Sequence, residues 1–367
     1  MGLAVFGGAS SAWAGTALSV PPDIPDPNGG VAVGQTNLPA SLTIQNGSTQ
    51  AQSSQTVTAS NITIVPSCGT LVISADCPVA SLDPGVFRLS ATGTGRAGTA
   101  CANQVFTTMK IDSAMDKYRF VPFSPATNPV LQRSDQGGPL SRCVINFTVD
   151  VLKVPTRDAR PEGGIQTGEL GGADAISSDT VVGGGVGTNF TTVSPATIPI
   201  RTDVAPTTPI TLGSTFHDTA TLTPNPGATP PTGSITFDVY GNSGCTGSPT
   251  FSSTNALNAS GTSATSDDFR PANAGTYYVI ARYPGDRNYN ALTTACGDPT
   301  EIAVVTRAPL PIVTQVTPTS GTIQLGGTFF DTATLGPKPT GAADPTGSVR
   351  FDVYDNQTCT GTPRFTS

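Results

Sequence analysis

Apolar and polar residues alternate along most of this chain, with the period of two that is typical of half-buried β-strands. In the first half, the alternation is clearest in the segments 40–44, 56–65, 86–90, 104–111, 118–123 and 143–152. We find no stretch with the period of an amphipathic helix. Short strands at this spacing predict an antiparallel β-sandwich.

The second half of the chain contains an internal repeat. The repeated blocks are Leu212–Leu222 with Leu325–Leu335, and Pro231–Tyr240 with Pro345–Tyr354. The blocks Pro231–Tyr240 and Pro345–Tyr354 are each followed by Cys-Thr-Gly, which begins at Cys245 in the first copy and at Cys359 in the second. A unit of this length is one small domain, not one element of a solenoid. We call the two copies repeat 1 and repeat 2.

Alternation within repeat 1 predicts strands at 208–212, 216–222, 234–240, 276–283 and 301–305. Repeat 2 contains no counterparts of the last two. We therefore predict an all-β chain of tandem antiparallel β-sandwiches, the last one truncated. Repeat 2 should then leave strand edges and one apolar face open.

Four segments follow from these patterns: 1–14, the remnant of a signal peptide; 15–201, an N-terminal β-sandwich domain with a Gly-rich closing segment; 202–306, repeat 1; and 307–367, the incomplete repeat 2. We expect a linker near Arg201–Thr207 and read the glycines at 183–187 as loop. A second, Pro-rich linker at 307–311 is stiff and makes packing of repeat 2 against repeat 1 unfavourable.

Repeats 1 and 2 resemble the Ig-like repeat modules of large bacterial secreted or surface proteins. The residues that carry this resemblance are Phe216–Leu222, Pro231–Phe237, Ala274–Tyr278, Tyr283–Tyr289 and Cys296–Glu301. The resemblance implies antiparallel β-sandwiches that serve as stalks, spacers or adhesive arms. It predicts fold better than function, because such sandwiches serve many roles.

The N-terminal domain resembles Ig-like modules of the choice-of-anchor type, which occur in bacterial surface proteins. The match covers residues 31–155 and is carried by Val33–Thr36, Leu42–Asn46 and Cys143–Phe147.

Three residues of repeat 1 have structural roles of their own. Tyr277 lies where a tyrosine corner is expected, with its hydroxyl bonded back to nearby backbone. The cysteine that usually follows two residues later is replaced by Val279. Gly285 and Asp286 predict a hairpin turn in which the Asp side chain bonds local backbone.

The start of the chain indicates export. Ala12-Trp13-Ala14 follows a short apolar stretch and forms a cleavage site, so the mature chain should begin near Gly15. Seven cysteines in an exported chain predict disulfides. The net charge is −7 and no segment is basic, which argues against a nucleic-acid partner. No later apolar run approaches the roughly 18 residues that span a membrane.

Repeat 1 should contain one disulfide, between Cys245 and Cys296, which would join two loops at one end of the sandwich. Cys359 matches Cys245, and its partner would fall beyond Ser367, so truncation leaves it unpaired. A zinc site is disfavoured, because no C-x-x-C pair occurs and the single histidine cannot complete a site.

The N-terminal domain contributes the other four cysteines. We expect the pairs Cys68–Cys77 and Cys101–Cys143. Four cysteines allow three pairings, so this connectivity stays open.

Catalytic chemistry has few candidates. The single histidine, His217, is replaced by Phe330 in repeat 2, so we expect a packed or edge-strand side chain. Asp267 and Asp268 are adjacent and are typical of a solvated turn rather than an acid–base pair. We predict no enzyme activity and no cofactor.

Two aspartates recur between the repeats and are the candidate ligands for a calcium ion. Asp238 matches Asp352, and Asp218 matches Asp331. No D-x-D-x-D-G run is present, and calcium needs six or more oxygens. We expect these side chains to be exposed and to promote solubility.

The sequence thus predicts a non-enzymatic, secreted or cell-surface protein with a structural or adhesive role. Its partner would be an unknown extracellular ligand or a component of the cell envelope. One alternative is a carbohydrate- or ligand-binding N-terminal module, for which Tyr118, Phe120 and Phe123 are the candidate aromatic strip. These three fit core alternation better. Another alternative is the accessory region of an exoenzyme whose catalytic domain lies outside this chain.

Overall fold

The computed structural model describes residues 18–19, 22–23, 31–46, 55–64, 85, 87–112, 116–123, 128–132, 138–154, 165–167, 170–177, 181–185, 191–206, 209–319 and 321–367. The expected signal remnant 1–14 and the cysteines Cys68 and Cys77 lie outside these residues. The chain divides into two compact units. The first contains 1–199 with 223–232 and 285–291, and the second contains 200–222, 233–284 and 292–367.

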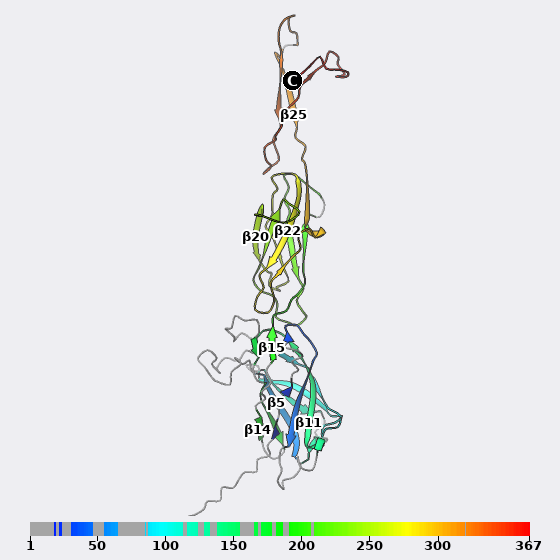
Figure 1. Ribbon diagram of the computed structural model, residues 1–367, viewed down its shortest axis with the longest axis vertical. Coiled ribbons are helices and arrows are strands. Elements are labelled where there is room, and N and C mark those ends of the chain that lie inside the picture. The colour runs from blue at the N-terminus through cyan, green and yellow to red at the C-terminus, as the bar shows by residue number, and fades with distance from the viewer. Residues whose placement is uncertain are drawn as a thin grey trace, which may run out of the picture. The chain divides into compact units, whose positions relative to one another are not determined.

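The first unit is built from β-strands, of which Figure 1 labels β5, β11, β14 and β15. They are β1 (Leu18–Ser19), β2 (Pro22–Asp23), β3 (Val31–Ala32), β4 (Leu38–Asn46), β5 (Gln55–Ile64), β6 (Phe87–Leu89), β7 (Thr92–Gly95), β8 (Val105–Asp112), β9 (Asp116–Pro122), β10 (Val130–Leu131), β11 (Arg142–Val151), β12 (Ile165–Thr167), β13 (Leu170–Ser177), β14 (Val181–Gly185) and β15 (Thr191–Ser194). A short 3-10 helix, η2 (Gly138–Ser141), precedes β11.

A large sheet in the order β1-β4-β11-β7-β8-β9-β5-β13-β14 organises this unit, with β2, β6 and β10 attached at its sides. A smaller sheet follows the order β12-β15-β3. In β11, the residues Cys143, Ile145, Phe147, Val149 and Val151 share one face and are all buried. The Phe147 ring lies 5.0 Å from that of Phe120 on β9. The alternation of the sequence is therefore the alternation of core and surface here.

Repeat 1 forms two sheets. Its strands are β16 (Ile200–Ala205), β17 (Ile210–Thr211), β18 (His217–Leu222), β19 (Ser234–Tyr240), β20 (Phe251–Ala256), β21 (Ser263–Thr265), β22 (Gly275–Tyr283), β23 (Leu292–Thr293) and β24 (Ile302–Thr306), with the 3-10 helix η3 (Pro299–Glu301) before β24. One sheet has the order β16-β18-β21, and the other has the order β17-β24-β22-β19-β20 with β23 beside β22.

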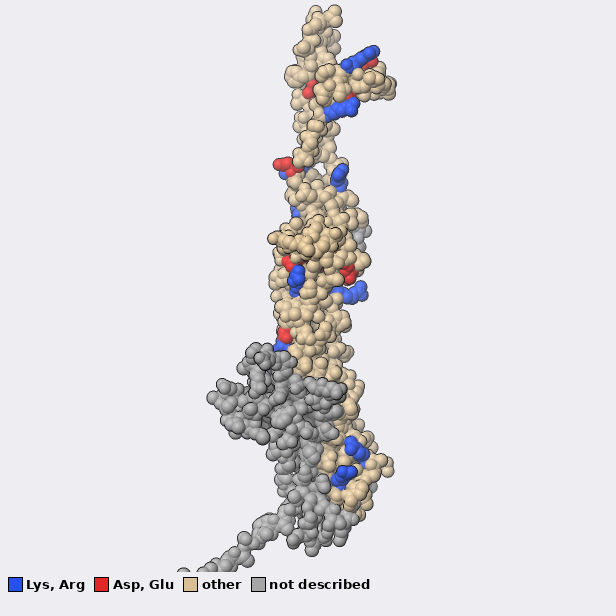
Figure 2. Space-filling model, in the orientation of Figure 1, with Lys and Arg blue, Asp and Glu red and all other residues tan. Residues whose placement is uncertain are grey.

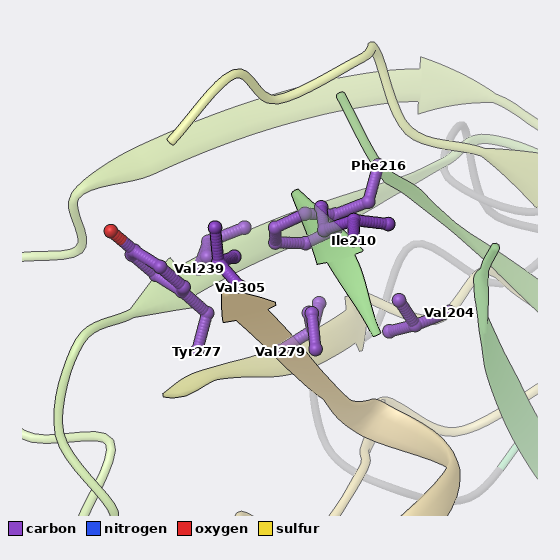
Figure 3. Packing of buried hydrophobic residues seen from close by; sticks show 8 residues of the cluster. Val204, Ile210, Phe216, Val239, Tyr277, Val279 and Val305 are labelled. Carbon is purple, nitrogen blue, oxygen red and sulfur yellow. The ribbon is translucent and has the colours of Figure 1, made fainter. Parts of the chain in front are cut away.

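The two sheets of repeat 1 bury a shared core. Figure 3 shows this cluster, in which Val204 on β16 and Phe216 before β18 meet Val239, Val279 and Val305 from the other sheet. Phe216 is also packed edge-on against Phe269, with ring centroids 5.4 Å apart. Side chains from both sheets in one cluster are what defines a β-sandwich. The all-β prediction is confirmed.

Repeat 2 is described over four strands, β25 (Ile312–Thr317), β26 (Phe330–Leu335), β27 (Asp352–Val353) and β28 (Phe365–Thr366). They pair as β25-β26 and β27-β28. Phe329 is 47 % exposed, whereas its counterpart Phe216 in repeat 1 is 1 % exposed. Repeat 2 therefore has counterparts of only some strands of repeat 1, and Phe329 lacks the buried environment of Phe216.

Two local expectations are wrong. The segment near 201–207, expected to be a linker, is largely the strand β16, whose residues 200–205 pair antiparallel with Leu222–His217 of β18. The glycines at 183–185 lie in β14, which pairs with β13, and not in a loop. In both places backbone pairing with another strand decides the conformation, and local composition does not report it. Among the described residues, no helix is long and apolar enough to cross a membrane.

Candidate functional site

A buried acidic pair lies between the two sheets of repeat 1. Asp218 on β18 and Glu301 at the end of η3 are each only 1 % exposed. The hydroxyl of Thr202 on β16 donates a hydrogen bond to Oε1 of Glu301. Both carboxyl oxygens of Asp218 and Oε2 of Glu301 have no hydrogen-bond partner. Asp218 is therefore not the exposed, solubilising side chain that the sequence analysis expected.

Burial changes the acidity of this pair. Burial, followed by the nearby charge of Glu301, raises the pKa of Asp218 to about 7. Burial also raises the pKa of Glu301, against the opposing hydrogen bond from Thr202. A carboxyl group in such a place favours its neutral form, because desolvation penalises the charge. Asp218 can therefore hold a proton near neutral pH.

Among the described residues, no group of three or more His, Cys, Asp or Glu side chains is placed to hold a metal ion. A signal for the burial of Asp218 was present in the sequence. Asp218 is in phase with Ala220 and Leu222, which are buried on the same face of β18. The same phase recurs in repeat 2 at Asp331, whose Oδ1 is also buried without a partner.

His217 lies on β18 and is partly exposed. Its Nδ1 is 3.1 Å from Oδ1 of Asp268, and the two side chains are 39 % and 63 % exposed. Asp267 beside it accepts a hydrogen bond from Nδ2 of Asn255. The geometry is an exposed side-chain contact at the start of β18, of a kind that contributes little energy.

Asp238 on β19 lies in a polar network across strands. Its Oδ2 is 3.1 Å from Nε of Arg282 on β22, and its Oδ1 accepts a hydrogen bond from Ser252 of β20. In repeat 2, Asp352 is paired with Arg350 and Thr366 in a similar way. These contacts satisfy the carboxylates with protein donors.

Two cysteine pairs lie at bonding distance in the described residues. Cys245 and Cys296 have Sγ atoms 1.96 Å apart and Cα atoms 5.9 Å apart. Cys101 and Cys143 are joined in the first unit, with Cα atoms 5.0 Å apart. Cys359 is exposed and free. The Cys245–Cys296 bond links the turn after β19 to the loop after β23.

The residues expected to shape repeat 1 have clear contacts. The hydroxyl of Tyr277 donates to the carbonyl of Asn273 at 2.8 Å, and Figure 3 shows this hydroxyl pointing away from the core. Gly285 has a φ of 83° and begins the loop between β22 and β23. Oδ1 of Asp286 accepts hydrogen bonds from the backbone N–H groups of Asn288 and Tyr289.

Asp286 also reaches beyond its own loop, which the sequence did not indicate. Its Oδ2 accepts hydrogen bonds from the backbone N–H and the hydroxyl of Thr232, both at 2.8 Å. Tyr289, which is 1 % exposed, donates its hydroxyl to the carbonyl of Thr229 at 2.7 Å. The loop 285–291 and the turn 223–232 are therefore tied into one structure.

A shallow groove of about 630 Å³ lies on the first unit. Its lining is mixed: Pro39, Ala40 and Phe147 are apolar, and the polar side chains include Thr92, Thr94, Arg96, Asn146 and Thr148. Nη2 of Arg96 donates to Oδ1 of Asn146 at 3.1 Å.

The candidate aromatic strip does not line this groove. Tyr118 and Phe120 are buried, in agreement with core alternation. Phe123 is 77 % exposed, so core packing is wrong for this residue, because it follows the end of β9 and is out of phase with the buried positions.

Charged groups are sparse on the surface. On the face shown in Figure 2, the Lys and Arg side chains of the described residues lie scattered among neutral ones, and some of them lie beside acidic side chains.

Comparisons with known proteins show similarity without a family assignment. No family model matches the chain, and no curated protein matches it. Among solved structures, the Escherichia coli adhesin FdeC is similar at 13% identity and a TM-score of 0.21, over 79% of this chain and 64% of that one. The native conformation of E. coli alpha-2-macroglobulin is similar at 11% identity and a TM-score of 0.17, over 82% of this chain and 17% of that one. The chain thus spans less than two thirds of the length of either structure.

Proposed function

We propose that this chain is a non-enzymatic, exported Ig-like repeat protein that acts as a stalk or adhesive arm at a bacterial cell surface. The observation that carries the proposal is the tandem repetition. The blocks Leu212–Tyr240 and Leu325–Tyr354 contain corresponding strands, β18 with β26 and β19 with β27. Serial copies of a small sandwich extend a chain without adding chemistry, which suits spacing and presentation.

Two further features support export. The A-x-A site Ala12–Ala14 precedes the first domain. The cysteine pairs Cys101–Cys143 and Cys245–Cys296 are joined, and such bonds persist in oxidising compartments. The position of the single histidine, His217, is held by Phe330 in repeat 2, which supports a role without catalysis.

The test is direct detection of the chain on intact bacteria. Protease treatment of whole cells that express the full chain should remove it while a cytoplasmic marker survives. Beads coated with the purified chain should then adhere to extracellular matrix or to bacterial envelopes more than beads coated with an unrelated β-sandwich. A chain that stays protected inside the cell, with reduced cysteines, would contradict the proposal.

A second candidate function is ligand binding by the N-terminal domain, and the polar side chains within the groove support it. Arg96 and Asn146 present amide and guanidinium groups among hydroxyls of Thr92 and Thr94. Such a lining suits a polar ligand such as a carbohydrate. Arg96→Ala should abolish binding on a glycan array, whereas Arg142→Ala, an exposed residue of β11 that does not line the groove, should not. Absence of binding by the unaltered chain would exclude this candidate.

A further inference from the structure

A turn of repeat 1 belongs to the first unit rather than to the repeat from which it comes. The turn 223–232 and the loop 285–291 group with the N-terminal sandwich. The backbone N–H of Thr229 in this turn donates to the carbonyl of Leu152, just after β11, at 2.8 Å. In the second unit, the backbone N–H of Ala343 in repeat 2 donates to the carbonyl of Ala272 in repeat 1, also at 2.8 Å. Thr229 and Ala343 occupy matching places ahead of the Pro-Thr-Gly of each copy.

A glycine allows each turn to approach closely. Gly34 has a φ of 84°, and a Cβ there would overlap the side chain of Asn225. Gly213 has a φ of 103°, and a Cβ there would lie 2.7 Å from Cβ of Pro339. Contacts below 3.0 Å require the neighbour to move. We call the surface that each turn contacts the receiving surface. In both units, the position of this surface that faces the turn needs glycine: Gly34 in the first unit and Gly213 in the second.

An arginine lies beside each turn. A Cβ added at Gly227 would lie 3.1 Å from Nη2 of Arg88, and one added at Gly341 would lie 2.5 Å from Cδ of Arg270. Arg88 is held in place by Asp150, with Nη2 and Oδ2 2.8 Å apart. Arg270 donates a hydrogen bond to the carbonyl of Gly213. Each receiving surface is thus made of one glycine, one arginine and one backbone carbonyl.

The segments that lead into the repeats match as well. Ala196-Thr-Ile-Pro-Ile200 precedes repeat 1, and Ala308-Pro-Leu-Pro-Ile312 precedes repeat 2. In the first unit, the N–H of Ala196 donates to the carbonyl of Asn288 at 2.8 Å, and the N–H of Asn290 donates to the carbonyl of Ala196 at 2.9 Å. The loop 285–291 is therefore bonded both to the turn 223–232 and to the segment that leads into repeat 1.

We propose that the repeats of this chain are joined by one recurring docking contact. The turn around Gly227-Ala228 and the turn around Gly341-Ala342 each bind a glycine–arginine–carbonyl surface, on the N-terminal sandwich and on repeat 1 respectively. The surface of Gly213, Arg270 and Ala272 is thus a docking site whose partner is the Gly-Ala turn of an adjoining repeat. The Pro-rich segment 307–311 does not prevent this contact. The proposal concerns how the modules are joined and holds whether or not the chain is adhesive.

The test in the first unit compares two glycines of the N-terminal sandwich in the full chain. Gly34→Ala and Gly98→Ala both place a side chain at positive φ, but a Cβ at Gly98 meets nothing within 4 Å. Hydrogen exchange at the Thr229 amide should rise on the order of tenfold in Gly34→Ala and stay unchanged in Gly98→Ala. Asn225→Gly should restore slow exchange to the Gly34→Ala chain, because it removes the overlapping side chain.

The second unit offers the same comparison. Gly213→Ala should accelerate exchange at the Ala343 amide, whereas Gly297→Ala, which meets nothing within 4 Å at a φ of 85°, should not. Pro339→Gly should restore slow exchange to the Gly213→Ala chain. Equal exchange in each matched glycine pair, or failure of both restoring substitutions, overturns the proposal. Faster exchange in Gly34→Ala without faster exchange in Gly213→Ala would show that the docking contact does not recur in the second unit.

Discussion

At the scale of single residues, the position of a side chain in the alternation indicates its burial better than its residue type does. Residue type favours an exposed side chain at Asp218, yet its phase matches the buried Ala220 and Leu222. The structure places it between the sheets with both carboxyl oxygens unpaired. A repeated acid at an inward-facing position is therefore a signal of a buried carboxyl group.

Asp218→Asn should remove most of the pH dependence of the stability of repeat 1. The pKa of Asp218 rises from 3.8 to about 7 on folding. Between these values the folded carboxyl keeps its proton and the unfolded one has lost it, so the free energy of unfolding falls as pH rises from about 4 to 7. The loss is up to about 4 kcal/mol, at roughly 1.4 kcal/mol per unit.

The measurement is urea unfolding of the full chain at pH 5 and pH 8. Asp218→Asn should be more stable than the unaltered chain at pH 8 and should lose less stability between the two pH values, with Glu301, whose pKa burial also raises, carrying the remaining dependence. Asp355→Asn, at an exposed carboxyl of repeat 2, should keep the original dependence. An unchanged slope in Asp218→Asn would contradict this assignment.

His217→Phe should leave folding and any binding nearly unchanged. The pair with Asp268 is exposed, and such pairs contribute about 0–1 kcal/mol. The buried neighbour Phe216 is the control, because Phe216→Ala should cost about 3–5 kcal/mol. Urea unfolding at pH 7 measures both. Loss of a measured activity in His217→Phe alone would show that the histidine has a chemical role.

At the scale of elements, the turn that contains the cysteine, 242–246 in repeat 1 and 356–360 in repeat 2, keeps its hydrogen bonds with and without a disulfide partner. In repeat 1, Oδ1 of Asn242 accepts a hydrogen bond from the N–H of Thr246 at 3.2 Å. In repeat 2, Oδ1 of Asn356 accepts the matching bond from Thr360 at 3.1 Å, although Cys359 is free. Local side-chain bonds therefore build the turn. The disulfide then links an already formed turn to a second loop.

Cys245 and Cys296 should be found bonded to each other by non-reducing peptide mapping. The double variant Cys245→Ser/Cys296→Ser should lower the stability of repeat 1 by about 4 kcal/mol, because the bond closes a loop with a sequence separation of 51. Cys359→Ser is the matched control and should have no effect. Two free thiols in the oxidised protein would contradict the pairing.

At the scale of the whole molecule, two copies of one pattern reach different degrees of burial. Ile210 is 7 % exposed in repeat 1, while Ile323 at the matching position is 41 % exposed. In repeat 1 the strands β22 and β24 contribute Val279 and Val305 to the cluster around Phe216. The four strands described for repeat 2 leave a hollow of about 570 Å³ that is lined by Phe329, Phe351 and Phe365 among others.

Hydrogen exchange should therefore be slow in β22 and fast in β27 and β28 of the full chain. Strand amides whose apolar side chains stay exposed open at little cost in free energy. The comparison of β19 with β27 is internally controlled, because the Phe-Asp-Val of β19 recurs at 351–353, of which β27 contains the last two residues. Equal protection of these two strands would show that repeat 2 is covered in solution.

The sequence by itself determined the all-β architecture, most strand positions of the first domain and of repeat 1, and the equivalence of the two repeats. Alternation is a local property of an extended backbone, so it can be read without knowing which strands meet. The pattern did not predict β20 and β21, which come in sequence between the predicted strands β19 and β22.

Only the tertiary structure decided the strand β16, the burial of Asp218 beside Glu301, and the turns that dock outside their own repeat. Each depends on contacts between segments far apart in the chain, such as Thr202 with Glu301 or Thr229 with Leu152. The environment of such a group is set by its distant neighbours, and neither residue type nor local period records them.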